Sequence, residues 1–303
     1  MRKSIWITSF AILTMISTGS LFASRRAPAP APKPAAPTAG EKTIYIHGFS
    51  LTSSNASCQG KSKCGYWSQQ TGNAVHVGYD GRLNPTHSYS TSGKTRLLAI
   101  LNQYCRRSKG QSCRIVCHSM GCYTSSYVVA QYNRGNTYRI NYVASLASAE
   151  GGSELANIGT GAIKTLARWL GGWFGGVIAD LVLYPAALNA LKTSYARSAF
   201  DHNRNNGILF YHTAGNDSAW YADWIYPGKD DRVVGFHSTC AYRSIKAFSR
   251  CGGESVRSCS WCFWQKKKNV SPWSGHKSST SYSRYGVKET HNNFQGKNKY
   301  HRK

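Results

Sequence analysis

The chain has 303 residues, of which 38 are lysine or arginine and 12 are aspartate or glutamate, for a formal net charge of +26. Such a balance implies attraction to polyanions such as anionic phospholipid, lipopolysaccharide, teichoic acid or nucleic acid. The net charge excludes no class of reaction, because its sign affects which partners the protein attracts and not which chemistry it performs.

Residues 1–23 have the pattern of a signal peptide: a short positive segment at Arg2 and Lys3, an apolar run, and small residues before Ser24. The apolar run is shorter than the roughly 18–20 residues of a spanning helix, which argues against a membrane anchor. No cysteine lies nearby to carry a lipid. We therefore expect a secreted or periplasmic protein.

Residues 24–41 alternate alanine with proline, which is typical of an extended linker. We expect one folded domain over residues 42–303, long enough to bury roughly 75% of its unfolded surface. Within it we expect an insertion at about residues 153–203 and a cysteine-rich basic segment at about residues 240–285. The insertion is apolar and helical, so it is either a lid or a buried core helix.

Strand-like and helical patterns alternate along the first half of the domain. Short β-rich runs occupy residues 43–46, 74–79, 113–117, 140–146 and 208–213, and helical spacing occupies residues 93–107 and 121–132. This order is typical of a parallel sheet with crossover helices, so we expect an α/β fold.

Ten cysteines in an exported chain predict disulfides. The short spacings are those between Cys58 and Cys64, Cys105 and Cys113, Cys240 and Cys251, and Cys259 and Cys262. A zinc site built from the last four is the alternative. Their irregular spacing and an oxidising compartment argue against it.

A nucleophile elbow is predicted where a strand runs directly into His118-Ser119-Met120-Gly121 and then into a helix. The tight turn would present the Ser119 hydroxyl, and the helix N-terminus favours developing negative charge. Cys117 stands where Gly-x-Ser-x-Gly motifs have their first glycine. Whether Cys117 and Cys122 are bridged is left open.

A second motif, His47-Gly48-Phe49, follows the first strand, with Gly48 standing 71 residues before Ser119. In an elbow-containing sheet this loop approaches the nucleophile. We assign the backbone N–H groups of Phe49 and Met120 as the oxyanion-hole donors.

These motifs resemble those of the bacterial triacylglycerol lipases, within the α/β-hydrolase superfamily. Residues 148–156 are similar to that family's Pro-His-x-Gly-Ser-x-x-Ala loop, although Ala149 and Glu150 stand where proline and histidine are usual. Residues 190–201 are similar to the segment that leads out of the lipase lid. The resemblance spans roughly residues 43–294 and is most specific at the elbow.

The resemblance implies a triad in the order Ser, Asp, His. Asp231 occupies the position of the acid in an Asp-x-Val-Val turn, with Asp230 and Asp217 as alternatives. His291 occupies the late position of the base. His276 and His237 remain alternatives for that role.

We therefore expect an exported hydrolase of carboxylic esters in which Ser119 attacks, His291 transfers the proton and Asp231 orients the imidazole. A polyester depolymerase or an acyltransferase could use the same triad, and a catalytically weak envelope-binding protein is the alternative from another class. The chemistry requires no metal or organic cofactor. The expected partners are an ester or lipid substrate and an anionic membrane or envelope surface, with no specific nucleic acid.

The cysteine-rich segment admits two interpretations. Its aromatic residues and Lys266–Lys268 could bind an anionic surface, or the segment could be a disulfide-pinned surface flap.

Overall fold

The computed structural model describes residues 40–50, 53–61, 65–158, 183–217, 225–226, 230–239, 282–283 and 289–294. The chain divides into two units, Met1–Pro32 and Lys33–Lys303, and everything described below belongs to the second. The predicted signal peptide, most of the linker, the centre of the predicted lid and nearly all of the cysteine-rich segment lie outside the described residues.

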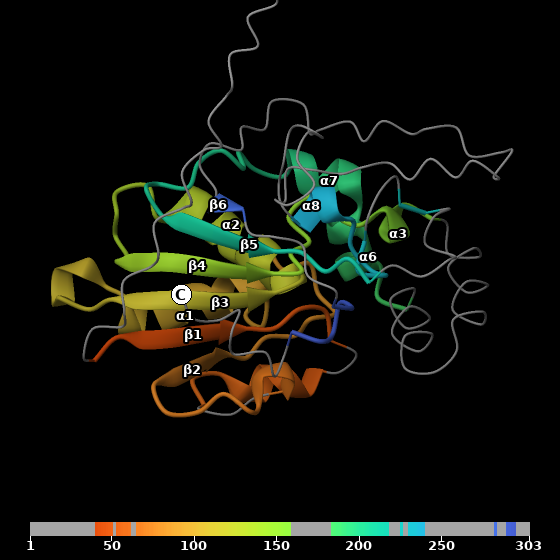
Figure 1. The fold of residues 1–303 in the computed structure, drawn as a ribbon. Helices are drawn as coiled ribbons and strands as arrows, with labels where there is room; N and C mark the ends of the chain where they lie inside the picture. Colours follow the sequence, from red (N-terminus) through yellow and green to blue (C-terminus); the bar gives the residue numbers. More distant parts are fainter. Residues whose placement is uncertain are drawn as a thin grey trace, which may run out of the picture. The chain divides into compact units, whose positions relative to one another are not determined.

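A parallel sheet forms the centre of the fold (Figure 1). Every neighbouring pair of its strands is parallel. In spatial order the strands are β2 (Ala74–Val77), β1 (Lys42–Ile46), β3 (Cys113–His118), β4 (Ile140–Leu146), β5 (Leu209–Thr213) and β6 (Tyr282–Ser283). A parallel central sheet with flanking helices is an α/β architecture, so the predicted fold class is confirmed.

The strand order reverses between β1 and β3. The chain goes from β1 outward to β2, then returns past β1 to β3 and continues to the opposite edge. In open α/β sheets, ligands bind outside the carboxyl ends of the strands at such a reversal. The motifs at Gly48 and Ser119 follow β1 and β3, so both lie at this point of the sheet.

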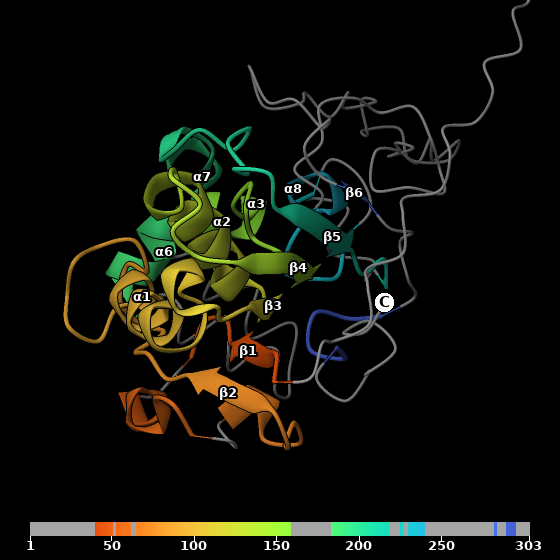
Figure 2. The same cartoon turned by 90° about the vertical axis from the view of Figure 1, so that its left-hand side faces the viewer.

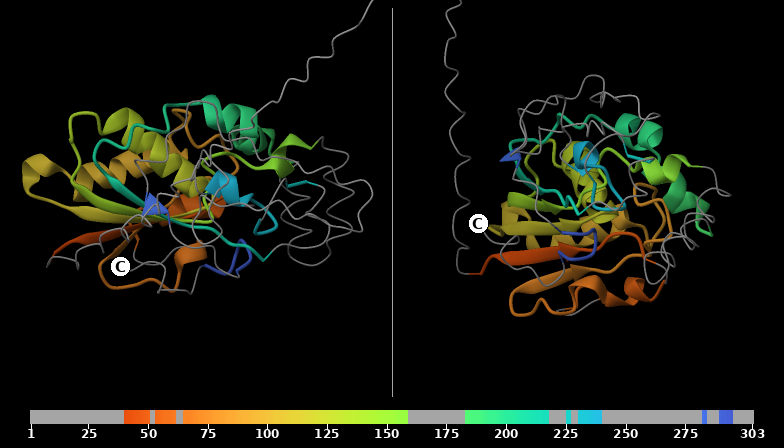
Figure 3. Two further views of the ribbon diagram at one scale, coloured as in Figure 1. Left: turned by 45° about the horizontal axis from the view of Figure 1, so that its top comes forward. Right: turned by 45° about the vertical axis from the view of Figure 1, so that its right-hand side comes forward.

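Helices α1 (Gly93–Tyr104) and α2 (Met120–Tyr132) cover one face of the sheet (Figure 2). The shorter helices gather beyond the carboxyl ends of the strands (Figure 1 and Figure 3). They are α3 (Glu154–Asn157), α6 (Pro185–Leu191), α7 (Thr193–Ser198) and α8 (Phe236–Thr239). The remaining turns are the 3₁₀ segments η1 (Ser53–Cys58), η2 (Gly65–Trp67) and η3 (Arg107–Lys109). No helix in the described part of the chain is long and apolar enough to cross a membrane.

Alternation along the strands divides the core into two clusters, because successive side chains point to opposite faces of a sheet. Ile44, Ile46 and Ile115 belong to the cluster under the helices. Tyr45 and Val116 belong to the cluster on the other face.

Two segments far apart in the chain cover that second face. Trp67 of η2 and Phe294 near the C-terminus are both fully buried there. The packing therefore brings η2 close to the segment that carries the predicted base.

Disulfides were expected without a fixed pairing, and the structure pairs Cys105 with Cys113, whose Cα atoms lie 5.4 Å apart. It joins the residue after α1 to the first residue of β3. Two elements are shorter than predicted: the helix expected over residues 93–107 ends at Tyr104, and the strand expected over residues 74–79 ends at Val77.

Candidate active site

Ser119 has a backbone conformation that is rare for any residue other than glycine. Ser119 stands between the end of β3 and the start of α2, and its backbone has a φ of 53° and a ψ of −126°. Such a conformation costs on the order of 1–3 kcal/mol and persists only where surrounding contacts over-determine it. Strained residues at strand-to-helix turns are the defining feature of nucleophile elbows.

Three main-chain hydrogen bonds hold this turn. The Ser119 N–H donates to the Leu146 carbonyl at 3.1 Å, and the Ser119 carbonyl accepts from Cys122 at 2.9 Å and from Ala149 at 3.3 Å. The neighbouring strand β4 and the loop after it therefore stabilise the strained residue.

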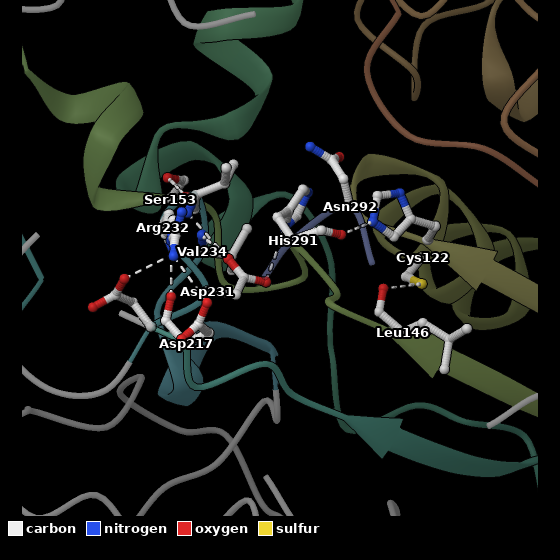
Figure 4. Close-up of polar contacts among 12 residues, drawn as sticks. Cys122, Leu146, Ser153, Asp217, Asp231, Arg232, Val234, His291 and Asn292 are labelled. Atoms are coloured by element: carbon white, nitrogen blue, oxygen red, sulfur yellow. Dashed lines mark hydrogen bonds and ion pairs between the residues drawn. The ribbon is translucent and has the colours of Figure 1, made fainter. Parts of the chain in front are cut away.

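A disulfide between Cys117 and Cys122 also spans the elbow, with Cα atoms 4.8 Å apart. This resolves the question that the sequence left open. The bridge links the strand to the first turn of α2 across Ser119, and Cys117 is accommodated in place of the usual glycine. The Cys122 sulfur lies 3.8 Å from the Leu146 carbonyl oxygen (Figure 4). A disulfide sulfur carries no proton, so this is a packing contact.

The loop after β1 lies directly against the elbow. A Cβ atom on Gly121 would lie 2.2 Å from the His47 carbonyl oxygen, and one on Gly48 would lie 2.6 Å from the Ser119 Cβ. Both distances are shorter than real Cβ contacts allow. Glycine at both positions is therefore what permits the two loops to meet.

The predicted oxyanion donors are the N–H groups of Phe49 and Met120. Met120 is the first residue of α2, where helix N–H groups have no partner within the helix. Neither N–H takes part in the hydrogen bonds recorded among the described residues. Phe49 and Met120 directly follow Gly48 and Ser119, the two residues at which the loop and the elbow meet.

His47 and Tyr79 hold the loop that contains Phe49. Their rings stack with centroids 4.2 Å apart, and the Tyr79 hydroxyl lies 2.7 Å from the His47 carbonyl and 2.9 Å from that of Gly48. Burial lowers the pKa of His47 to about 4. The neutral ring donates from Nδ1 to the Gly48 carbonyl at 2.7 Å, so His47 acts as a structural donor.

Asp231 and His291 are brought together although 60 residues separate them. The His291 Nδ1 lies 2.9 Å from the Asp231 Oδ2 (Figure 4), and the His291 N–H donates to the Asp231 carbonyl at 3.0 Å. Asp231 is fully buried, and its Oδ1 accepts from the N–H groups of Val233 and Val234 at 3.1 and 2.8 Å. A carboxylate held in this way fixes the tautomer of the imidazole and leaves Nε2 for proton transfer.

The two alternative acids have other partners. Asp217 forms an ion pair with Arg232 at 2.9 Å, also seen in Figure 4. Asp230 Oδ1 accepts from the Arg232 N–H at 2.8 Å. Both carboxylates hold Arg232 next to Asp231. Among the described residues, neither forms a hydrogen bond or ion pair with His291.

Of the alternative bases, His237 pairs with Glu154, with Nε2 2.6 Å from Oε1. His276 lies outside the described residues. Among the described residues, no hydrogen bond joins the Ser119 hydroxyl to His291. Their connection runs instead through His118, whose Nε2 lies 2.7 Å from the His291 carbonyl oxygen.

No protein-family model matches the chain, and no curated protein matches it. Solved structures do resemble it.

One is the lipase BlEst2 of Bacillus licheniformis, at 18% identity. Its propeptide form has a TM-score of 0.45, with 72% of this chain and 46% of that chain covered. Its mature form has a TM-score of 0.44, with 69% of this chain and 82% of that chain covered. This chain thus spans about half the length of the propeptide form.

Two others are EstA from Clostridium botulinum and phospholipase PlaB from Legionella pneumophila. EstA has 10% identity and a TM-score of 0.44, with 88% of this chain and 85% of that chain covered. PlaB has 18% identity and a TM-score of 0.39, with 66% and 45% covered. Values of this size assign no activity to this chain.

The loop resembling the lipase Pro-His-x-Gly-Ser-x-x-Ala motif contacts α7, α8 and the loop that carries Asp231. The Ser153 hydroxyl donates to the Val233 carbonyl, two residues after Asp231. Glu154 accepts from Arg197 of α7 at 3.2 Å and pairs with His237 of α8. The sequence motif predicts none of these contacts, because they join residues more than 40 positions apart.

Glu150 stands at the position where lipases usually carry histidine in this loop. It is buried, and the hydroxyl of Ser126 in α2 donates to its Oε1 at 2.5 Å. Burial raises the pKa of Glu150 to about 8, so at neutral pH the carboxyl is mostly protonated. Glu150 therefore adds little negative charge at this buried position. In the described part of the chain, no cluster of three or more histidine, cysteine or acidic side chains is arranged to hold a metal ion.

Proposed function

We propose that this chain is an exported serine hydrolase of carboxylic esters, lipase- or esterase-like, with Ser119 as nucleophile. The observation that carries the proposal is the strained backbone of Ser119 at the reversal of the sheet, directly against the glycine loop at Gly48. The Asp231–His291 hydrogen bond supports it independently. Export is supported by the pattern of residues 1–23 and by the buried disulfides.

The proposed reaction has two halves. Ser119 Oγ attacks the ester carbonyl carbon while His291 Nε2 takes its proton, and the N–H groups of Phe49 and Met120 stabilise the oxyanion. His291 then gives the proton to the leaving alcohol, which leaves an acyl-enzyme. Water attacks the acyl-enzyme with His291 again as base, releases the acid and restores Ser119. Asp231 orients the imidazole and stabilises its charged form.

The test is fluorophosphonate labelling of the folded, oxidised chain, with the adduct located by peptide mass spectrometry. We expect a single adduct on Ser119, because an activated serine reacts far faster than ordinary hydroxyls. Asp231→Asn should slow labelling by orders of magnitude, since a carboxylate removed from a triad costs about 10⁴-fold in turnover in other serine hydrolases. An adduct on another residue, or none on folded protein, would contradict the proposal.

Hydrolysis and acyl transfer use the same acyl-enzyme. Product analysis with esters of graded chain length and an added acceptor alcohol separates them. Free acid as the main product supports the hydrolase, and a new ester supports an acyltransferase.

We also propose that the chain binds an anionic envelope surface through two basic turns. These turns, residues 105–113 and 133–140, lie at the amino ends of β3 and β4 (Figure 1), whereas Ser119 follows the carboxyl end of β3. They are joined by main-chain hydrogen bonds from Arg107 to Thr137 and from Arg139 to Cys105. The basic residues they carry are Arg106, Arg107, Lys109, Arg134 and Arg139.

Four of these five cations are exposed, and none forms an ion pair with an acid among the described residues. Unneutralised cations that the fold holds together attract anionic lipid headgroups by about 1 kcal/mol each. Because the turns lie at the opposite ends of the strands from Ser119, binding through them does not cover the elbow.

Replacing Lys109 and Arg139 by serine should weaken binding to phosphatidylglycerol vesicles by about tenfold or more at low salt. The matched control replaces Lys61 and Arg204, an exposed lysine and arginine outside the turns, and should weaken binding less. Vesicle co-sedimentation measures both. Equal losses in the two variants would show that net charge, and not the basic turns, drives binding.

A further inference from the structure

His118, the residue before the candidate nucleophile, contacts the loop that carries the candidate base. Its Nε2 lies 2.7 Å from the His291 carbonyl oxygen, and the two imidazole rings have centroids 4.7 Å apart. Burial, together with the nearby charge of His291, holds the pKa of His118 well below its usual value. The ring is therefore neutral. Since its Nε2 faces a carbonyl, Nε2 must carry the proton and donate.

Tyr66 of η2 makes a parallel contact. Its ring stacks on His118, with centroids 4.3 Å apart and planes inclined by 13°, and its hydroxyl donates to the Asn292 carbonyl at 3.2 Å. Two stacked rings thus donate to the carbonyls of consecutive residues, His291 and Asn292. Trp67 packs edge-on against both rings and is itself buried.

The base loop, residues 289–294, is held on two sides. On the acid side, the His291 N–H donates to the Asp231 carbonyl. On the nucleophile side, His118 and Tyr66 hold the base loop through the carbonyls of His291 and Asn292. These partners are 173 and 226 residues apart in the chain. His118 is covalently next to Ser119. Its hydrogen bond therefore transmits the position of the elbow to the main chain of His291.

His118 is not itself suited to act as the base. Its Nε2 proton is committed to a carbonyl, and its Nδ1 lies on the side of the Gly48 loop, 3.3 Å from where a Cβ on Gly48 would be. A buried ring that stays neutral and donates to main chain can fix a distance but cannot shuttle protons.

We propose that His118 and Tyr66 are positioning residues that set the separation of Ser119 from His291 through the main chain of the base loop. The inference rests on the proposed function, because it assigns the two residues a role in that same triad. A displacement of about 1 Å in a catalytic group can cost about 10²-fold in rate, so a donor that fixes this separation has a large effect.

Three variants distinguish the effect of the hydrogen-bond donor from the effects of ring stacking and side-chain size. His118→Phe keeps a stacked ring and removes the donor, and His118→Gln restores an N–H donor of similar reach. Tyr66→Phe removes only the hydroxyl. The matched control is His76→Phe, because His76 is also buried and its Nε2 lies 3.2 Å from a main-chain carbonyl, that of Gln70, which is not part of the base loop.

For His118→Phe we expect kcat on a small soluble ester to fall by about 10–100-fold with KM nearly unchanged. His118→Gln should recover part of the loss. Tyr66→Phe should lose less, and the double variant should lose less than the product of the single losses, because both side chains act on one loop. The pH at which kcat/KM falls on the acid side should stay the same, since His118 carries no catalytic proton. His76→Phe should lose stability but not turnover.

Amide hydrogen exchange of the His291 loop supplies a readout that does not need activity. Exchange at the His291 N–H should be faster in His118→Phe than in wild type and unchanged in His76→Phe. Wild-type kcat in His118→Phe, or a loss equal to that of His76→Phe, would overturn the inference while leaving the proposed function intact. Failure of the proposed function is recognised separately, as wild-type protein that is not labelled at Ser119.

Discussion

Replacing Ser119 by alanine is expected to lower ester turnover by about 10³–10⁶-fold, the range seen when serine hydrolases lose their nucleophile. The Ser119 side chain makes no capping hydrogen bond to α2, and the three hydrogen bonds that hold the turn are main-chain bonds. The substitution therefore removes the nucleophile without removing a structural contact. The thermal midpoint should stay close to that of wild type.

Steady-state kinetics on a soluble ester, paired with thermal unfolding of the same samples, measures both quantities. Ser125→Ala is the matched control, because Ser125 is a buried serine of α2 whose hydroxyl donates to the Gly121 carbonyl at 2.8 Å. It should lose a little stability and no turnover. Activity in Ser119→Ala that stays near wild type in pure protein would reject Ser119 as the nucleophile.

Gly121→Ala should lower both stability and turnover, although alanine has a higher helix propensity than glycine. Alanine within a helix normally stabilises by about 0.5–1 kcal/mol relative to glycine. Here its Cβ would lie 2.2 Å from the His47 carbonyl oxygen and 2.9 Å from that of Ile46. Both atoms belong to main chain next to the oxyanion loop, so relief of the clash must separate that loop from the elbow.

We expect Gly121→Ala to lose turnover by about 10²-fold or more, because the Phe49 and Met120 donors would no longer face the same oxygen. Thermal stability should fall as well. Gly135→Ala is the control, since a Cβ there meets no atom within 4 Å and Gly135 has no positive φ. If Gly121→Ala unfolds at a higher temperature than wild type and keeps its turnover, the close contact between the elbow and the loop after β1 would be contradicted.

Local pattern was enough to predict the order of strands and helices and the position of the elbow. Period-two and helical spacing are properties of neighbouring residues, as is the change from strand to helix at Ser119. The ends of elements were less predictable. Helix α1 stops at Tyr104, three residues before the end of its helical pattern, and Cys105, the residue after it, is bridged to Cys113.

The choice of acid shows a different limit. Asp230 and Asp231 are neighbours of the same chemistry, and only resemblance to lipases separated them in the sequence. In the structure the Asp231 carboxylate meets His291, while that of Asp230 turns back to the Arg232 N–H. Adjacent side chains point in different directions, so the surrounding fold decides which of them reaches the histidine.

The sequence by itself determined a parallel α/β sheet, a strained serine turn and a glycine loop, because each of these depends on residues close together in the chain. Only the tertiary structure decided that Cys117 is bridged to Cys122 across the elbow, and that His118 and Tyr66 reach the carbonyls of the base loop. The latter contacts join residues 173 and 226 positions apart. Over such separations, the packing on the faces of the sheet determines which side chains meet. A local sequence pattern cannot predict these contacts.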